Sequence, residues 1–143
     1  MKRRNGFTLI EILIAMTIIG ILSSVVGLSV AGYLRKAKLE AARSQIKTFQ
    51  TALQMYKAAH AQIPTTAQGL GALCIAPTIP PTPRDYPPEG YLESRNLPND
   101  PWGNPYIYLV PGRRGEPYEI ISYGADGEEG GTGEAADISS GQM

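Results

Sequence analysis

Residues 7–34 read FTLIEILIAMTIIGILSSVVGLSVAGYL, and Glu11 is their single charged residue. The 23 residues 12–34 would form a helix of roughly 35 Å, long enough for the ~30 Å hydrocarbon core of a bilayer. The preceding residues 1–6, MKRRNG, are basic, and a basic flank stays on the cytoplasmic side of a membrane. The sequence therefore predicts one membrane-spanning helix, with residues 35–143 outside the cytoplasm.

An ordinary cleavable secretory signal is the alternative interpretation of this segment. Such a signal has a short apolar core followed by a small-x-small cleavage site, and Ser29-Val30-Ala31 offers one. The apolar run is longer than such a core, however. Glu11 also argues against a plain anchor, because a carboxylate in a spanning helix costs roughly 3 kcal/mol unless it is paired or faces protein.

Residues 1–16, MKRRNGFTLIEILIAM, resemble the class III signal of type IV pilin-like proteins, with a basic leader, Gly6, Phe7 and Glu11 in the matching places. The resemblance implies that a prepilin peptidase cleaves after Gly6 and methylates the new amino terminus at Phe7. It also implies that Glu11 pairs with the terminal ammonium of a neighbouring subunit during assembly. Such pairing is physically reasonable, because burying either charge without the other is costly.

The next segment, residues 35–60, has no proline or glycine and is rich in good helix formers. Its apolar residues recur in alternating steps of three and four, which is the spacing of a helical stripe. The stripe consists of Leu39, Ala42, Ile46, Phe49, Leu53 and Tyr56. We expect the anchor to continue as an amphipathic helix that packs its stripe on downstream residues.

After this helix, Pro64 ends the helical pattern, and Thr65 or Thr66 is placed to cap a second, short helix. Cys74 is expected to be a small buried apolar residue, and a single cysteine cannot form an intrachain disulfide. Residues 77–88 hold six prolines and are predicted to form an irregular loop.

Three later stretches have strand character: residues 90–93, 106–110 and 118–122. We expect a small antiparallel sheet whose one face lies against the helical stripe, with Trp102 filling its margin. The predicted fold class is α+β: a long N-terminal helix, half membrane-spanning and half amphipathic, packed on a small antiparallel sheet, which is a type IV pilin-like arrangement.

The tail is acidic, with seven carboxylates and no basic side chain from Gly115 onward. Nucleic-acid binding is excluded as a function class, because it needs a basic face that displaces counterions. Residues 122–137 are rich in glycine and in the hard oxygen ligands that calcium prefers, although they do not fit the twelve-residue helix–loop–helix pattern. A disordered acidic tail is the alternative interpretation.

The pattern Ser-x-Gly-x-Asp-Gly-x-x-Gly-Gly followed by Asp-Ile is similar to the calcium loop of major pseudopilins of type II secretion systems. The resemblance implies a Ca²⁺ ion held by the side chains of Asp126 and Asp137 and the carbonyl of Tyr123. Ser122, Thr132 and Glu134 are further candidates. Relatives usually carry one more aspartate, where this chain has Ala135 and Ala136, so water, Glu134 or Thr132 would complete the coordination.

The resemblance divides the chain into a cleaved leader (1–6), a hydrophobic transmembrane and assembly helix (7–34) and a periplasmic globular domain (35–143). It implies a structural subunit of a type II secretion pseudopilus, a helical filament that drives export of folded proteins across the outer membrane. Implied partners are other copies of the chain, a prepilin peptidase, minor pseudopilins and the assembly platform of the bacterial inner membrane.

Two other functions are alternatives to this one. The first is a type IV pilin for adhesion, motility or surface electron transfer. The second is an anchored or secreted enzyme, which is disfavoured because no nucleophile–base pair and no HExxH-type metal motif is visible. The chain also has no phosphate-binding loop, so energy for assembly would come from a separate ATPase.

Overall fold

The computed structural model describes residues 7–143, except for the side chains of residues 25–29. The predicted leader, including Gly6, lies outside the described residues. The chain divides into two compact units, Met1–Ala37 and Lys38–Met143. Within the described part of the chain, no helix combines the length and the apolar character that crossing a membrane requires.

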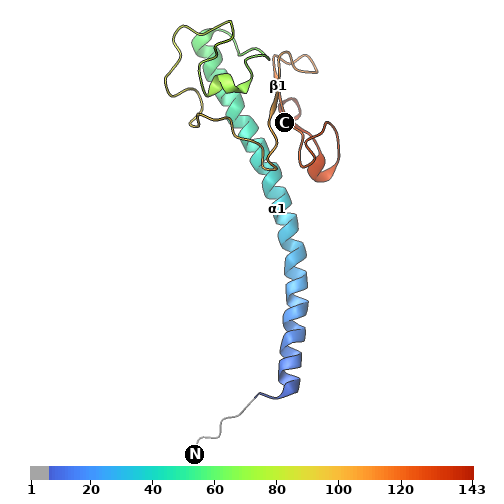
Figure 1. The fold of residues 1–143 in the computed structure, drawn as a ribbon. Coiled ribbons are helices and arrows are strands. Elements are labelled where there is room, and N and C mark those ends of the chain that lie inside the picture. The colour runs from blue at the N-terminus through green and yellow to red at the C-terminus, as the bar shows by residue number, and fades with distance from the viewer. Residues whose placement is uncertain (1–6) are drawn as a thin grey trace, which may run out of the picture. The chain divides into compact units, whose positions relative to one another are not determined.

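Helix α1 spans Leu9–His60, 52 residues, so the predicted continuation of the apolar segment into the amphipathic segment is confirmed (Figure 1). The helix ends where expected. Ala61 takes a left-handed conformation with φ 60°, and its N–H donates to the carbonyl of Lys57 at 2.8 Å. A left-handed residue just past the last turn is a common way for a helix to stop.

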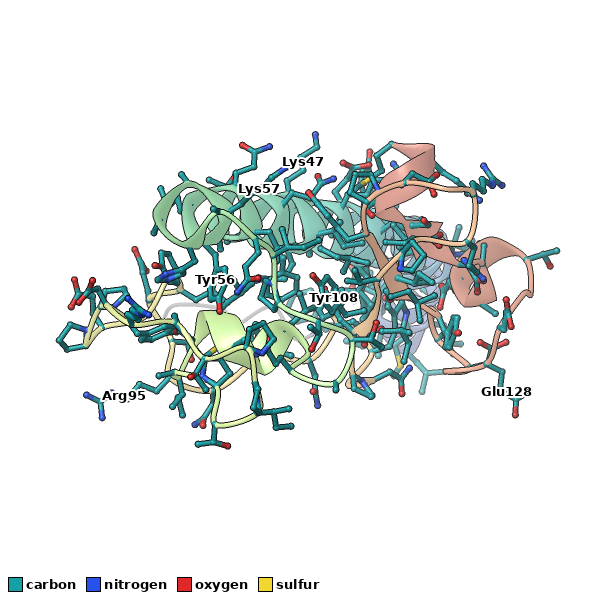
Figure 2. The ribbon with its side chains drawn as sticks, turned by 90° about the horizontal axis from the view of Figure 1, so that it is seen from above. Lys47, Tyr56, Lys57, Arg95, Tyr108 and Glu128 are labelled. Carbon is teal, nitrogen blue, oxygen red and sulfur yellow. The ribbon has the colours of Figure 1, made fainter. Side chains whose placement is uncertain are left out.

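The predicted stripe is the helical side of the core of the second unit. Ala42, Ile46, Phe49, Leu53 and Tyr56 expose 2% or less of their surface. From the other side they meet Tyr106, Tyr108, Ile120 and Ile138, and the Phe49 and Tyr106 rings pack edge to face at 5.0 Å. Figure 2 shows Tyr56 and Tyr108 pointing into this interior, while Lys47 and Lys57 point outward from the helix. Leu39 and Trp102 are partly buried at the margin of the core, as expected.

The sheet has three antiparallel strands in the order β1-β2-β3: β1 is Ile107–Leu109, β2 is Glu119–Ser122 and β3 is Ile138–Ser139. Tyr108 pairs with Ile120, and Ser122 pairs with Ile138. The predictions for β1 and β2 are confirmed, and the sheet lies beside the C-terminal part of α1 within the second unit (Figure 1). The third strand comes from the tail, immediately after Asp137.

The prediction of a strand at residues 90–93 is wrong. This segment pairs with no strand of the sheet and is held instead by contacts of Tyr91. Tyr91 donates its N–H to the carbonyl of Leu73 at 2.7 Å, and its hydroxyl lies 2.7 Å from Nε2 of His60. Its ring packs against Tyr56 at 5.3 Å. At Gly90, with φ 77°, an added Cβ would lie 2.6 Å from the Cys74 carbonyl oxygen, so the backbone approaches too closely for any other residue.

The segment between α1 and the sheet is irregular, as the prolines indicate, apart from the short 3₁₀ helix η1, Leu70–Leu73. In the turn before η1, the Thr65 hydroxyl accepts from the N–H of Gln68, and the Gln68 side chain accepts from the N–H of Thr65. The Thr66 hydroxyl instead bonds both the N–H and the carbonyl of Val110. Cys74 is buried, and this burial raises the pKa of its thiol, in keeping with an apolar role.

Candidate functional sites: the helix start and the tail loop

The first candidate site is the start of α1, where Thr8 and Glu11 bind each other. The Glu11 carboxylate accepts from the N–H and from the hydroxyl of Thr8, both at 2.8 Å, and the Glu11 N–H lies 3.4 Å from the Thr8 hydroxyl. This reciprocal arrangement is a capping box, which satisfies N–H groups that a helix start leaves without partners.

Thr8 was missed as a functional residue at the sequence level. The signal was present, because Thr-x-x-Glu immediately before an apolar run is the pattern of a capping box. Within this single chain, Glu11 therefore has a local role in starting the helix. The two hydrogen bonds from Thr8 also fix the orientation of the Glu11 carboxylate.

The second feature of this region is its exposed apolar surface. Phe7 exposes 83% of its surface, Leu9 81% and Ile19 63%. Further large apolar side chains that are about half exposed or more lie along the same segment: Ile10, Ile12, Leu13, Ile14, Met16, Ile18, Ile21, Leu22, Val30 and Leu34. An apolar surface of this extent marks a site that lipid or other protein covers.

The second candidate site is the tail loop, residues 123–137, which joins β2 to β3 and is folded upon itself. Ala125 donates its N–H to the carbonyl of Glu134 at 2.9 Å, and Ala135 donates to that of Thr132 at 3.2 Å. At Gly131, with φ 79°, an added Cβ would lie 2.4 Å from the Ala135 carbonyl oxygen. The two arms of the loop therefore lie against each other, which is incompatible with the alternative of a structureless acidic tail.

The loop is tied to the sheet through a buried carboxylate, Asp100, which was not singled out from the sequence. One of its oxygens accepts the N–H groups of Trp102 and Asn104, and the other accepts the Ser122 hydroxyl at 2.6 Å. Asn104 donates its side-chain amide to the carbonyl of Gly124 at 2.7 Å. The turn composition of residues 97–105 predicted a loop, but the burial of Asp100 depends on tertiary packing that sequence does not reveal.

The predicted calcium ligands lie at different depths in this loop. Asp126 is exposed, and one of its oxygens accepts the N–H of Glu128 at 3.2 Å. Asp137 is half-buried and accepts the N–H of Gly130 at 3.0 Å. Tyr123 and Glu134 are half-buried, and Thr132 is exposed. Ser122 is wholly buried, and its hydroxyl is occupied by Asp100 and by the N–H of Gly124.

The donor chemistry of the loop suits a hard cation only if backbone oxygens take part. Among residues 7–143 with described side chains, no three His, Cys, Asp or Glu side chains come together in a way that could hold a metal. Calcium takes six to eight oxygens and readily uses carbonyls and water. A cation in this loop would therefore need backbone carbonyls and water in addition to the carboxylates of Asp126 and Asp137.

Comparison with known proteins bears on both sites. The family "Type II secretion system (T2SS), protein G" matches residues 29–141, and the "Prokaryotic N-terminal methylation motif" matches residues 1–27. The type II secretion system core protein G of Pseudomonas aeruginosa is 46% identical over 137 residues, which is 96% of this chain and 94% of the relative. That of Vibrio cholerae is 45% identical over 138 residues, 96% of this chain and 92% of the relative.

Among solved structures, the chain is similar to the major pseudopilin from the type 2 secretion system of enterohaemorrhagic Escherichia coli. The TM-score is 0.66 at 37% identity, with 78% of this chain and 93% of that chain covered. A long N-terminal helix, a small antiparallel sheet and a methylation motif together define the class of pilin-like subunits. Within that class, the chain belongs to the type II secretion system protein G family. These relatives match the pseudopilin interpretation and not the alternative of a type IV pilin.

Proposed function

We propose that the chain is the major structural subunit of a type II secretion pseudopilus and assembles with copies of itself into a helical filament. The observation that carries the proposal is the exposed apolar surface along α1 in a member of the protein G family. Such a surface is unfavourable in water, so it has to be covered either by lipid or by other copies of the chain. The protein's contribution is structure and movement, so that filament growth exports folded proteins across the outer membrane.

Before assembly, the subunit is proposed to be anchored in the inner membrane by residues 7–34, with residues 35–143 in the periplasm. The methylation motif over residues 1–27 supports processing by a prepilin peptidase, with cleavage after Gly6 and methylation at Phe7. Minor pseudopilins and an inner-membrane assembly platform are the further partners of such a filament. The same apolar segment would exchange lipid contacts for contacts with neighbouring helices as the subunit leaves the membrane.

Glu11 is proposed to set the register between neighbouring subunits by pairing with the amino-terminal charge of Phe7 in another copy. Thr8 holds the carboxylate by two hydrogen bonds of 2.8 Å, which fixes its orientation before a neighbour arrives. A preoriented carboxylate loses less side-chain entropy when it pairs. In the apolar interior of a filament an unpaired charge is costly, so only the register that pairs the two charges is stable.

The tail loop is proposed to bind one Ca²⁺ through the side chains of Asp126 and Asp137 and the carbonyl of Tyr123. Thr132, Glu134 or water would complete the shell, while the Ser122 hydroxyl is already used inside the protein. A bound cation would offset the repulsion among the carboxylates of the loop. It would thereby stabilise the fold of the loop without taking part in any reaction.

The assembly proposal is tested by replacing Glu11 with Ala in a strain whose secretion depends on this chain. We expect the variant to accumulate in the inner membrane and the melting temperature of the Lys38–Met143 unit to be unchanged, because Glu11 lies outside that unit, while secretion falls at least about tenfold. The amino-terminal ammonium of the neighbouring subunit would be buried without its partner, which costs more than ~1.4 kcal/mol per contact.

Glu40→Ala is the matched control, because it removes an exposed carboxylate of the same helix, one that pairs with Arg43 at 2.7 Å. This control should secrete normally. Normal secretion by Glu11→Ala would contradict the register role. Secretion that persists without the chain, together with surface filaments that retract, would contradict the pseudopilus itself.

A further inference from the structure

Arg113, in the turn between β1 and β2, binds one carboxylate with three of its N–H groups. Its backbone N–H donates to Oε2 of Glu119 at 3.0 Å, its Nε donates to the same oxygen at 3.1 Å, and its Nη2 donates to Oε1 at 3.1 Å. This is a two-pronged guanidinium–carboxylate contact, the strongest geometry for such a pair.

Glu119 is a rigid anchor for that contact. It exposes 4% of its surface, and the Ser139 hydroxyl of β3 donates to its Oε1 at 2.6 Å. Its backbone belongs to β2, paired with Leu109 of β1. The guanidinium of Arg113 is therefore held by a group that is itself fixed to all three strands.

One part of the guanidinium reaches outward from this anchor. Nη1 of Arg113 donates to Oε1 of Glu129 at 2.5 Å, and Glu129 lies in the tail loop between Asp126 and Asp137. No basic side chain occurs from Gly115 onward, so the loop has no cation of its own. The hairpin turn supplies that cation across 16 residues of sequence.

Exposed ion pairs usually contribute little, because ordering two long side chains offsets the attraction. Here the Glu129 side chain is 66% exposed, but Arg113 is 35% exposed and already ordered by Glu119. Only Glu129 has to be ordered when the pair forms. The pair is therefore favoured over an isolated surface pair of the same geometry.

We propose that Arg113 is a positioning residue that fastens the tail loop to the sheet through Glu129, independently of any metal ion. The loop then has its fold, with Asp126 and Asp137 in place, before a cation binds. The inference does not rest on the proposed calcium site, because neither Arg113 nor Glu129 belongs to its ligand set.

The test is hydrogen–deuterium exchange of the full mature chain in detergent micelles with a calcium chelator present. The variant is Glu129→Ala, and the matched control is Glu128→Ala, which removes the neighbouring carboxylate. Glu128 is exposed, and Figure 2 shows it pointing away from the molecule. We expect amides of residues 125–135 to exchange about threefold faster in Glu129→Ala than in the control, the size of effect that an exposed ion pair supports.

A second variant, Arg113→Lys, keeps the charge but lacks the planar fork, so it should also speed exchange in the loop. Exchange in Glu129→Ala that equals exchange in Glu128→Ala would overturn the proposal. Adding calcium separates it from the metal site. If calcium leaves wild-type exchange unchanged while Glu129→Ala remains faster than the control, the calcium proposal fails and the role of Arg113 stands.

Discussion

The two halves of α1 differ in whether the rest of the chain covers their apolar side chains. Both halves carry large apolar side chains, yet Phe49 is fully buried within the chain while Leu9 remains 81% exposed. The difference lies in what the rest of the chain supplies. Residues 38–60 have the sheet and the irregular segment around Tyr91 to pack on, whereas nothing within the described residues of the first unit covers residues 7–24.

The same contrast holds for the carboxylates of the two regions. Glu119 is buried and bonded to Arg113 and Ser139, whereas Glu11 is exposed and, among the described residues, its carboxylate is bonded to Thr8, three positions earlier. A buried charge must find its partners inside the chain, and an exposed one at a helix start need not. The second unit thus pairs its buried charge within the chain, whereas the N-terminal half of α1 leaves its apolar side chains exposed to other molecules.

The largest predicted effect is that of Phe49→Ala in the completed half. Removing this ring leaves a cavity beside Tyr106, and we expect the free energy of unfolding to fall by about 3–5 kcal/mol. Thermal unfolding of the mature chain in micelles, followed by circular dichroism, should show a melting temperature lower by about 15 °C.

Ile14→Ala is the counterpart in the other half, because Ile14 is 53% exposed. It should leave the melting temperature within about 1 °C of wild type, since no cavity forms. A large loss of stability in Ile14→Ala, or none in Phe49→Ala, would break the distinction between the two halves.

Sequence patterns predicted the elements whose signal is local. The three-and-four spacing of Leu39 to Tyr56 predicted both the helix and its buried face, because this periodicity reports directly on one side of a helix. The β1 and β2 strands followed from apolar runs on either side of a glycine-rich turn. The same reasoning failed at residues 90–93, where the ring of Tyr91 packs against Tyr56 and His60 and no strand forms.

The polar interior could be predicted only in part. Resemblance to a family loop predicts Asp126 and Asp137 as metal ligands, and this role stays a prediction. The buried Asp100 and the contact of Arg113 with Glu119 were not anticipated, because each depends on which segments the fold brings together. An acid in a turn and an arginine in a hairpin look like ordinary solvated residues until the sheet places them.

The next largest predicted effect is the loss of stability when the buried carboxylate of Glu119 is protonated. Hydrogen bonds from Arg113, with those from Ser139, outweigh burial and lower the pKa of Glu119 from 4.5 to about 2. Because the folded-state pKa lies below the unfolded value, the stabilisation is complete above pH 4.5 and is lost as the pH falls toward 2. We expect about 2 kcal/mol of unfolding free energy to disappear across this range.

Urea unfolding at a series of pH values measures this loss. Glu119→Gln should be less stable than wild type at pH 7 and should have a flatter dependence between pH 4.5 and 2, since the titrating group is gone. Equal slopes for the two proteins in that window would assign the acid sensitivity to other carboxylates. Glu40→Gln serves as the control, because its pair with Arg43 is exposed on both sides.

The smallest predicted effect is that of calcium on the tail loop of the second unit. If calcium completes it, wild type should melt a few degrees higher in calcium than in chelator, because a ligand that binds only the folded state stabilises it by mass action. Asp126→Ala should lose this calcium-dependent shift of about 1–2 kcal/mol and should resemble chelated wild type. Glu128→Ala, which removes a neighbouring carboxylate outside the proposed ligand set, should retain the shift. Asp126→Ala and wild type that melt alike in both calcium and chelator would show that internal contacts alone complete the loop, as they complete the core around Phe49.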